Sequence, residues 1–368
     1  MKVKSQLLGM EPYKPGKPME EVKKELGLKE VHKLASNENP YGASPKVHEA
    51  VKQAALHPEI YPDGYAASIR EAVAQDFNIK KSQLIFGAGS DEVILMLCRA
   101  FLTSETNTVM AAPTFSQYKH NAVIEGAEIR EVPLKDGVHD LPRMLDQIDD
   151  KTRIVWVCNP NNPSGTYVGK EAFEKFLKQV PDHVLVVSDE AYIEYVTADD
   201  YPNTLSYLSE FSNLMVLRTF SKAYGLASMR IGYGVASEEL ISILDPVRPP
   251  FNTTTIAQHA AIAALDDKAY IEDCRIKNRE ALDQFEAFCD DRQLSYLPSQ
   301  TNFMLIHTGV PGDKMFTSLL KKGIIVRSGE ALGFSDWIRV TAGTSEQNKL
   351  FLQAFDECLN EFKHSVKG

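Results

Sequence analysis

Hydrophobic and polar positions follow two periods along the chain, and together they predict alternating helices and strands. Residues 46–56, 68–77 and 91–102 repeat apolar positions at the spacing of one helix face. Short, largely apolar runs lie between such segments, a pattern typical of strands buried on both faces. The sequence therefore predicts the α/β class, with a mostly parallel sheet covered by helices on both sides. The apolar runs are at residues 84–86, 108–111, 154–157, 184–188, 214–217 and 231–235.

The remaining sequence predicts an arm and a second, smaller domain. Residues 1–45 are rich in Pro, Gly and Lys, and we expect them to form an arm that packs on the small domain and on a partner subunit. Residues 46–260 would form the large domain, and residues 261–368 a small α+β domain. An amphipathic stretch at 269–292 begins the small domain. Strand, helix, strand, strand and helix are then expected at 302–306, 312–321, 324–327, 337–341 and 346–363.

Composition and charge exclude several classes of function. The 368 residues carry a formal charge of −10, which argues against nucleic-acid and anionic-membrane partners. No apolar run approaches the roughly 20 residues of a membrane-spanning helix. The five cysteines are widely spaced with no CxxC pair, and the nine histidines form no metal-ligand cluster, so we expect neither disulfides nor a metal. A reducing, cytoplasmic location fits this pattern.

The strongest chemical signal is the segment TFSKAYGLASMR, which runs from Thr219 to Arg230. Small and hydroxyl residues flank Lys222, so its side chain would be free to swing and form a Schiff base. The hydroxyl groups of Thr219 and Ser221 could donate to a phosphate, and the guanidinium of Arg230 could bind the same phosphate through its fork of donors. Taken alone, the segment is also compatible with a surface lysine after a strand.

Three further motifs lie where predicted strands end, which is where open α/β sheets bind ligands. They are NPNNPSG at 159–165, DEAY at 189–192 and GAGSD at 87–91. The glycine turn would offer backbone N–H groups to a phosphate at a helix N-terminus. It lacks the third glycine of a dinucleotide fingerprint, and no GxxxxGK[ST] occurs, which excludes NAD and P-loop interpretations. Each motif alone has a plain alternative, such as a common turn or a helix cap.

Along the chain the motifs occur in the order glycine turn, Asn-Pro turn, DEAY and lysine segment. In this order they resemble those of the fold-type I pyridoxal-phosphate aminotransferases, over nearly the whole chain. The lysine segment fits the class II signature. Within the class, the sequence is most similar to the histidinol-phosphate aminotransferases, although related aromatic amino-acid aminotransferases share several of the matching segments. Those segments are residues 34–42, 61–63, 248–253, 257–258, 325–327 and 338–341.

The resemblance implies a role for each matching residue around pyridoxal phosphate. Lys222 would be the Schiff-base lysine and would move the proton at the substrate's α carbon, while Asp189 would pair with the pyridine nitrogen. Asn162 and Tyr192 would bond the ring oxygen, and Phe115 would stack on the ring. The groups at the phosphate would be Ser90, Asp91, Thr219, Ser221 and Arg230, together with Tyr61 from the neighbouring subunit of a homodimer.

The resemblance also implies the substrates, L-histidinol phosphate and 2-oxoglutarate, which yield imidazole-acetol phosphate and L-glutamate in histidine biosynthesis. Arg339 would hold the substrate phosphate or carboxylate with help from Arg327, although Arg327 could equally be a surface ion-pair partner. The residues expected at the substrate are Tyr13, Asn37, Tyr61, Asn162, Arg327 and Arg339.

Three other functions remain open at this point. An aromatic amino-acid aminotransferase would use the same catalytic residues, and only the shape of the distal pocket would tell it apart. Decarboxylation or acyl-CoA condensation could occur on the same scaffold, but condensing relatives usually stack a histidine where Phe115 stands. A non-catalytic ligand-binding protein is disfavoured, since Lys222 is present and the chain is too short for an added DNA-binding domain.

Overall fold

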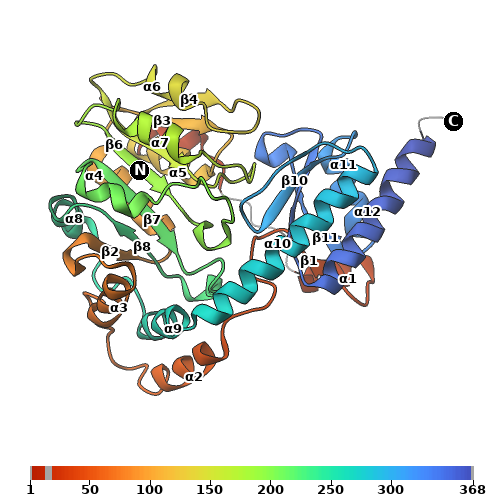
Figure 1. Ribbon diagram of the computed structural model, residues 1–368, viewed down its shortest axis with the longest axis horizontal. Coiled ribbons are helices and arrows are strands. Elements are labelled where there is room, and N and C mark those ends of the chain that lie inside the picture. Colours follow the sequence, from red (N-terminus) through yellow and green to blue (C-terminus); the bar gives the residue numbers. More distant parts are fainter. Residues whose placement is uncertain (1, 13–18, 366–368) are drawn as a thin grey trace.

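The computed structural model describes residues 2–12 and 19–365, so Tyr13 lies outside the described residues. Figure 1 shows a larger body built around one sheet beside a smaller body that contains α10, α11 and α12. No helix among the described residues is long and apolar enough to cross a membrane. The five cysteines are all buried and unpaired.

The large sheet has seven strands in the order β2-β8-β7-β6-β5-β3-β4. β8 runs antiparallel to both of its neighbours, and the other neighbouring pairs are parallel. This confirms the mostly parallel sheet that the sequence predicts. The strands are β2 (Leu84–Gly87), β3 (Asn107–Ala112), β4 (Glu128–Pro133), β5 (Thr152–Cys158), β6 (Leu185–Asp189), β7 (Leu214–Thr219) and β8 (Gly232–Val235).

Apolar side chains on both faces explain why the strands read as continuous apolar runs. In β5, Ile154 and Trp156 belong to one buried cluster, while Val155 and Val157 belong to the cluster on the opposite face. Successive side chains of a strand point to opposite sides, so each strand needs helices on both. One face packs on α4 (Ser90–Phe101), α5 (Ser116–Glu125) and α8 (Glu238–Leu244). The other packs on α2 (Pro45–Ala54), α3 (Ala67–Phe77), α6 (Leu141–Leu145), α7 (Lys170–Leu177) and α9 (Thr255–Leu265).

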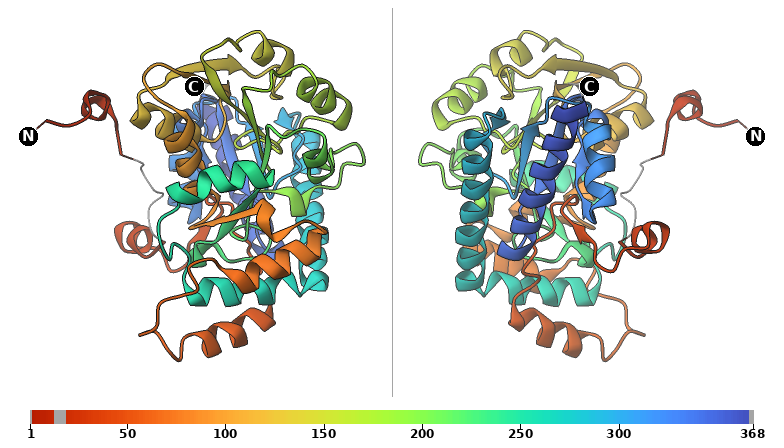
Figure 2. Two further views of the ribbon diagram at one scale, coloured as in Figure 1. Left: turned by 90° about the vertical axis from the view of Figure 1, so that its left-hand side faces the viewer. Right: turned by 90° about the vertical axis from the view of Figure 1, so that its right-hand side faces the viewer.

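The small sheet is antiparallel, with the order β12-β13-β10-β9. Figure 2 (right) shows its helices, from teal to dark blue, side by side on one face. Phe285, Phe351 and Phe355 fill the core between the helices and the sheet. The elements are α10 (Lys268–Asp291), β9 (Tyr296–Leu297), β10 (Phe303–His307), α11 (Gly312–Lys321), β12 (Arg327–Ser328), β13 (Trp337–Thr341) and α12 (Ser345–Ser365).

The single strand predicted at 324–327 is wrong, because the chain changes partners at Val326. β11 (Ile324–Ile325) pairs in parallel with β1 (His32–Lys33) of the N-terminal segment, whereas β12 pairs antiparallel with β13. Helix α1 (Met19–Leu26) lies beside this junction and buries Val22 against Ile325. The N-terminal segment is thereby joined to the small sheet by both hydrogen bonds and apolar contacts.

Candidate active site

A cleft of about 1160 Å³ lies between the carboxyl ends of the large-sheet strands and the small sheet. Among the described residues, all the site residues predicted from the sequence line it except Tyr61. Tyr61 is 80% exposed and stacks on Phe251, with ring centroids 4.9 Å apart. The residues brought together are Asn37, Ser90, Asp91, Phe115, Asn162, Asp189, Tyr192, Thr219, Ser221, Lys222, Arg230, Arg327 and Arg339.

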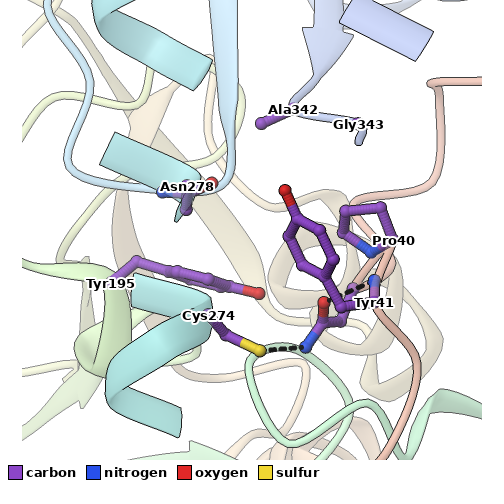
Figure 3. A pocket seen from close by; sticks show the side chains of 8 residues that line it. Pro40, Tyr41, Tyr195, Cys274, Asn278, Ala342 and Gly343 are labelled. Atoms are coloured by element: carbon purple, nitrogen blue, oxygen red, sulfur yellow. Dashed lines mark hydrogen bonds between the residues drawn. The ribbon is translucent and has the colours of Figure 1, made fainter. Parts of the chain in front are cut away.

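A second cavity is too narrow to hold a water molecule. Figure 3 shows Tyr41 of the N-terminal segment facing Tyr195 and helix α10 across this space. Asn39 Nδ2 donates a hydrogen bond of 3.3 Å to Cys274 Sγ on α10. The contact between the N-terminal segment and α10 is packed protein interior, so the large cleft is the candidate site.

Asp189 ends β6 with its carboxylate buried under the cleft floor. Its Oδ2 atom accepts a hydrogen bond of 2.6 Å from the hydroxyl of Tyr118, and its Oδ1 atom has no partner among the described residues. Burial raises the pKa of Asp189 to about 6, although the Tyr118 hydrogen bond acts in the opposite direction. An unpartnered carboxylate oxygen in a buried position calls for an N–H donor from a bound molecule.

Lys222 lies three residues after the end of β7, the strand beside β6, and is half-buried. Burial, together with the positive charge of Arg339, lowers its pKa to about 8. Its Nζ atom lies 5.7 Å from the ring centroid of Tyr192. A lysine in this state holds a substantial neutral fraction near neutral pH, which is the form that attacks a carbonyl.

One end of the cleft presents donors suited to a phosphate. Helix α4 begins at Ser90, directly after Gly89, whose positive φ of 81° turns the chain into the helix. Arg230 lies so close that a Cβ atom on Gly89 would be 2.7 Å from its Nη2 atom. The hydroxyls of Thr219 and Ser221 lie 2.9 Å from each other at the end of β7. A helix N-terminus, two hydroxyls and a guanidinium form a site for an anion.

Asp91 tempers the positive charge at this end of the cleft. Its carboxylate lies 3.7 Å from Arg230 Nη2 in the first turn of α4. Burial raises the pKa of Asp91, and the charge of Arg230 partly offsets that rise. Gly89, Ser90 and Asp91, at the N-terminus of α4, all line the cleft.

Two arginines face each other at the other end of the cleft. Arg327 and Arg339 are register partners across β12 and β13, and both line the cleft. Arg339 Nη1 donates to Asn162 Oδ1 over 2.5 Å, and its Nη2 donates to the carbonyl of Ala35 over 3.0 Å. The structure describes no ion pair of Arg327 within residues 2–12 and 19–365. Like charges directly opposite each other destabilise a sheet, so this pair predicts an anionic ligand.

Three groups of the cleft fit pyridoxal phosphate in particular. The open Oδ1 atom of Asp189 suits a protonated ring nitrogen, Lys222 supplies an amine for the aldehyde, and the anion site at Ser90 suits the phosphate. Phe115 lies half-buried at the cleft wall beside Asp189, at the start of α5. The residues present therefore fit the cofactor.

Comparison with known proteins assigns the chain to a family. The sequence pattern of aminotransferase class I and II matches residues 29–355. The chain is 62% identical to the histidinol-phosphate aminotransferase of Halalkalibacterium halodurans, covering 98% of both chains. It is 59% identical to that of Geobacillus sp. strain WCH70, covering 98% of this chain and 99% of the relative. The chain belongs to the class I and II aminotransferases, on their histidinol-phosphate branch.

Solved structures agree with this family assignment. The histidinol-phosphate aminotransferase of Sinorhizobium meliloti, solved in complex with pyridoxal-5'-phosphate, superposes with a TM-score of 0.90 at 26% identity over 98% of both chains. An aspartate aminotransferase variant of Thermus thermophilus superposes with a TM-score of 0.84 at 22% identity, covering 97% of this chain and 100% of that one. The second match shows a shared fold alone.

Sequence reasoning missed Tyr118, which contacts the Asp189 carboxylate of this aminotransferase's cleft. Tyr118 is fully buried, stacks on Trp156 at 4.7 Å and meets Phe115 edge-on at 5.5 Å. The signal was the spacing of three residues between Phe115 and Tyr118, which places both on one face at the start of α5. From the sequence alone, a single tyrosine in a helix is predicted to be a core residue. Its contact with Asp189 depends on how α5 packs on the sheet.

Proposed function

We propose that this chain transfers an amino group between L-histidinol phosphate and 2-oxoglutarate in histidine biosynthesis, using pyridoxal phosphate. The observation that carries the proposal is the paired Arg327 and Arg339 in the same cleft as Lys222 and Asp189. Each guanidinium offers a fork of donors that matches phosphate and carboxylate geometry, so the two together suit a phosphate group.

The cofactor would be held at three points. Asp189 Oδ1 would bond the ring nitrogen, and the hydroxyl of Tyr192 with the side-chain amide of Asn162 would bond the ring oxygen. Phe115 would lie against the ring. When bound, pyridoxal phosphate supplies an electron sink that stabilises negative charge at the substrate's α carbon. The phosphate would rest on Ser90, Thr219, Ser221 and Arg230, beside Asp91.

Lys222 would act as the base and acid of the reaction. Its lowered pKa leaves Nζ able to accept a proton from the substrate's α carbon as a base and then to donate that proton as an acid. The walls of the cleft would exclude water from this proton transfer. Because both substrates present an anion to the same two arginines, they would bind in turn rather than together.

A homodimer would complete the site. Tyr61 is exposed and stacks on Phe251, which is exposed as well, and the apolar side chains of Leu56, Ile60 and Tyr65, near Tyr61 in the sequence, are also exposed. Such a patch is typical of a contact surface. We propose that this face packs on a second copy and that the partner subunit's Tyr61 reaches the phosphate end of the cleft.

Three further assignments belong to the same proposal. We divide the chain into an arm at 1–45, a large cofactor-binding domain at 46–260 and a small domain at 261–368, with the substrates between the last two. Tyr13 would close over the substrate from the arm, and Asn37 would contribute to its binding.

A cytoplasmic location fits five buried cysteines without a disulfide.

An aromatic amino-acid substrate is the second candidate. Phe316, Leu320 and Leu332 form an apolar wall of the cleft near the arginines, which suits a phenyl ring as well as an imidazole. Arg339 would then bind the carboxylate of phenylalanine or tyrosine. The number of charges on the substrate separates the two candidates, since only a phosphate would use both arginines fully.

An absorption titration tests the proposal directly. The purified protein is loaded with pyridoxal phosphate, L-histidinol phosphate is added, and 2-oxoglutarate follows. We expect the visible band of the bound cofactor to disappear and then to return, with a much weaker response to phenylalanine and tyrosine. A Lys222→Ala variant, which lacks the amine, should show neither change. A band that responds to the aromatic amino acids and not to histidinol phosphate would replace the substrate assignment, and no band at all would overturn the cofactor assignment.

A further inference from the structure

Asn37 makes an unusual set of contacts at the junction of three parts of the molecule. It is 2% exposed and has a positive φ of 55°. Its Nδ2 atom donates to the hydroxyl of Tyr192 over 3.0 Å. Its Oδ1 atom accepts from the hydroxyl of Thr341 over 2.9 Å, and its backbone N–H donates to the same Thr341 oxygen over 3.0 Å. Asn302 Nδ2 donates to its carbonyl.

The backbone N–H of Asn37 fixes the direction of every hydrogen bond in the series that links Thr341, the Asn37 side chain and Tyr192. A backbone N–H can only donate, so the Thr341 oxygen accepts from Asn37 and its hydrogen must go elsewhere. Thr341 is 3% exposed, and the acceptor described for that hydrogen is Asn37 Oδ1. The opposite orientation of the amide would leave the buried hydroxyl hydrogen without an acceptor. The Nδ2 atom of Asn37 therefore points at Tyr192.

The consequence falls on Tyr192. Because its oxygen accepts a hydrogen bond from Asn37, its own hydrogen is directed away from Asn37. No acceptor for that hydrogen occurs among residues 2–12 and 19–365. Tyr192 lines the cleft, so the hydrogen is available to a molecule bound there.

We propose that Asn37 is a positioning residue that directs the hydroxyl hydrogen of Tyr192 into the cleft, toward the ring oxygen of the cofactor. The inference rests on the proposed function, and it assigns Asn37 a task other than direct contact with the substrate. An amide is required at this position, because only a side chain with an acceptor and a donor can transmit the direction set by Thr341. A carboxylate would accept from both hydroxyls and turn the Tyr192 hydrogen away from the cleft.

The test is an Asn37→Asp variant, whose side chain has nearly the same shape. We expect its dissociation constant for pyridoxal phosphate to rise about tenfold, the loss of one hydrogen bond. The Tyr192→Phe variant should show a similar rise. If Asn37 acts through Tyr192, then Asn37→Asp should change the constant less than about twofold when Tyr192 is already phenylalanine. The pH at which the visible band of the bound cofactor changes should shift in the same direction in both single variants.

Two controls separate this effect from damage to the fold. Asn278 is another buried asparagine whose Nδ2 donates to a protein oxygen, the carbonyl of Thr301, and it does not line the cleft. Asn278→Asp should leave cofactor affinity unchanged in whatever fraction of the protein folds. Thr341 is the first member of the hydrogen-bond series. Thr341→Ser should keep wild-type affinity for pyridoxal phosphate, while Thr341→Val should lower it several-fold. This pair tests the direction of the hydrogen bonds even if Asn37→Asp does not fold.

The outcomes separate the inference from the proposed function. A wild-type protein that binds no pyridoxal phosphate overturns the proposed function itself. A wild-type protein that binds it, together with a tenfold loss from Asn37→Asp in the Tyr192→Phe background, overturns the positioning role alone. Equal affinity of Asn37→Asp and wild type would do the same.

Discussion

The hydroxyl of Tyr118 donates a 2.6 Å hydrogen bond to Asp189 Oδ2 and leaves the buried Oδ1 atom without a partner among the described residues. Tyr118 is itself held by stacking on Trp156, which lies in β5 beside β6. A buried carboxylate with one oxygen fixed has a single orientation in which to meet a bound N–H group. The pair thus joins the packing of α5 on the sheet to the chemistry at the cleft floor.

We predict that Tyr118→Phe weakens cofactor binding and moves its pH dependence. Burial raises the pKa of Asp189 to about 6, and the lost hydrogen bond would raise it further. The carboxylate binds a protonated ring only when ionised, so affinity falls as the pH drops through the pKa of Asp189. The affinity of Tyr118→Phe should therefore decline at a higher pH than that of wild type, with a loss of about tenfold at pH 7. Fluorescence titration with pyridoxal phosphate between pH 5 and 8 measures both.

Other titratable groups near Asp189 also affect its pKa, but Tyr118→Phe leaves each of these neighbouring groups in place. Tyr207→Phe is the matched control, since its hydroxyl also donates to a carboxylate, that of Glu174, at 2.7 Å and away from the cleft. An unchanged pH profile in Tyr118→Phe would show that the hydrogen bond does not act on Asp189. The neighbouring groups are Asp91, Cys158, Glu190 and Tyr192.

A second prediction concerns the stability cost of Lys222. Its folded pKa of about 8 lies below the ordinary value of 10.5, so the unfolded chain binds more protons between these pH values. Stability of the cofactor-free protein should therefore rise with pH through that window, and the full penalty should apply below pH 8. Lys222→Met should raise the free energy of unfolding by about 1–3 kcal/mol at pH 7, and this gain should shrink toward pH 10. Urea unfolding measures it.

Lys170→Met provides the comparison for that experiment. Lys170 is an exposed lysine on α7, with 60% of its side chain accessible. We expect its replacement to change stability by less than about 0.5 kcal/mol at either pH. A destabilised Lys222→Met protein at pH 7 would contradict the prediction, because it would mean that packing of the lysine outweighs its desolvation.

Arg327 and Arg339 should favour a substrate that carries a phosphate over one that lacks it. Each of Arg327→Gln and Arg339→Gln removes a charged donor, so kcat/KM for L-histidinol phosphate should fall about 10- to 100-fold. Arg339→Gln should be the more severe, because Arg339 also bonds Asn162 and the carbonyl of Ala35. Steady-state kinetics with L-histidinol, which lacks the phosphate, give the control. Equal losses on both substrates in Arg327→Gln would argue against a role at the phosphate.

The close approach of Gly89 to Arg230 gives a prediction with a built-in control. A Cβ atom on Gly89 would lie 2.7 Å from Arg230 Nη2, at a φ of +81°. Gly309 has a similar φ of +72°, and a Cβ there would meet nothing within 4 Å. Both alanine variants should lose about 1–2 kcal/mol of stability from the backbone conformation. Only Gly89→Ala should also lose cofactor affinity, by about tenfold, and equilibrium dialysis with pyridoxal phosphate distinguishes them.

Much of the fold could be predicted because its strands are apolar on both faces and its helices have regular periods. The bounds of α11 and β13 agree with the predicted segments to the residue. The strand at 324–327 could not be predicted correctly, because Ile325 and Arg327 pair with segments nearly 300 and about 12 residues away along the chain. Local pattern carries no information on which distant partner a strand will find.

The sequence by itself indicated the family and the cofactor of this protein, since Lys222, Asp189, Asn162 and Arg230 stand in motifs whose residue types have few other uses together. It also placed them at strand ends, where parallel strands bring side chains to one edge. Only the tertiary structure decided the contacts of Tyr118 with Asp189 and of Asn37 with Tyr192. Those contacts join residues far apart in the chain, and they depend on the packing of α5 and of the N-terminal segment, which burial of apolar surface sets and local sequence does not encode.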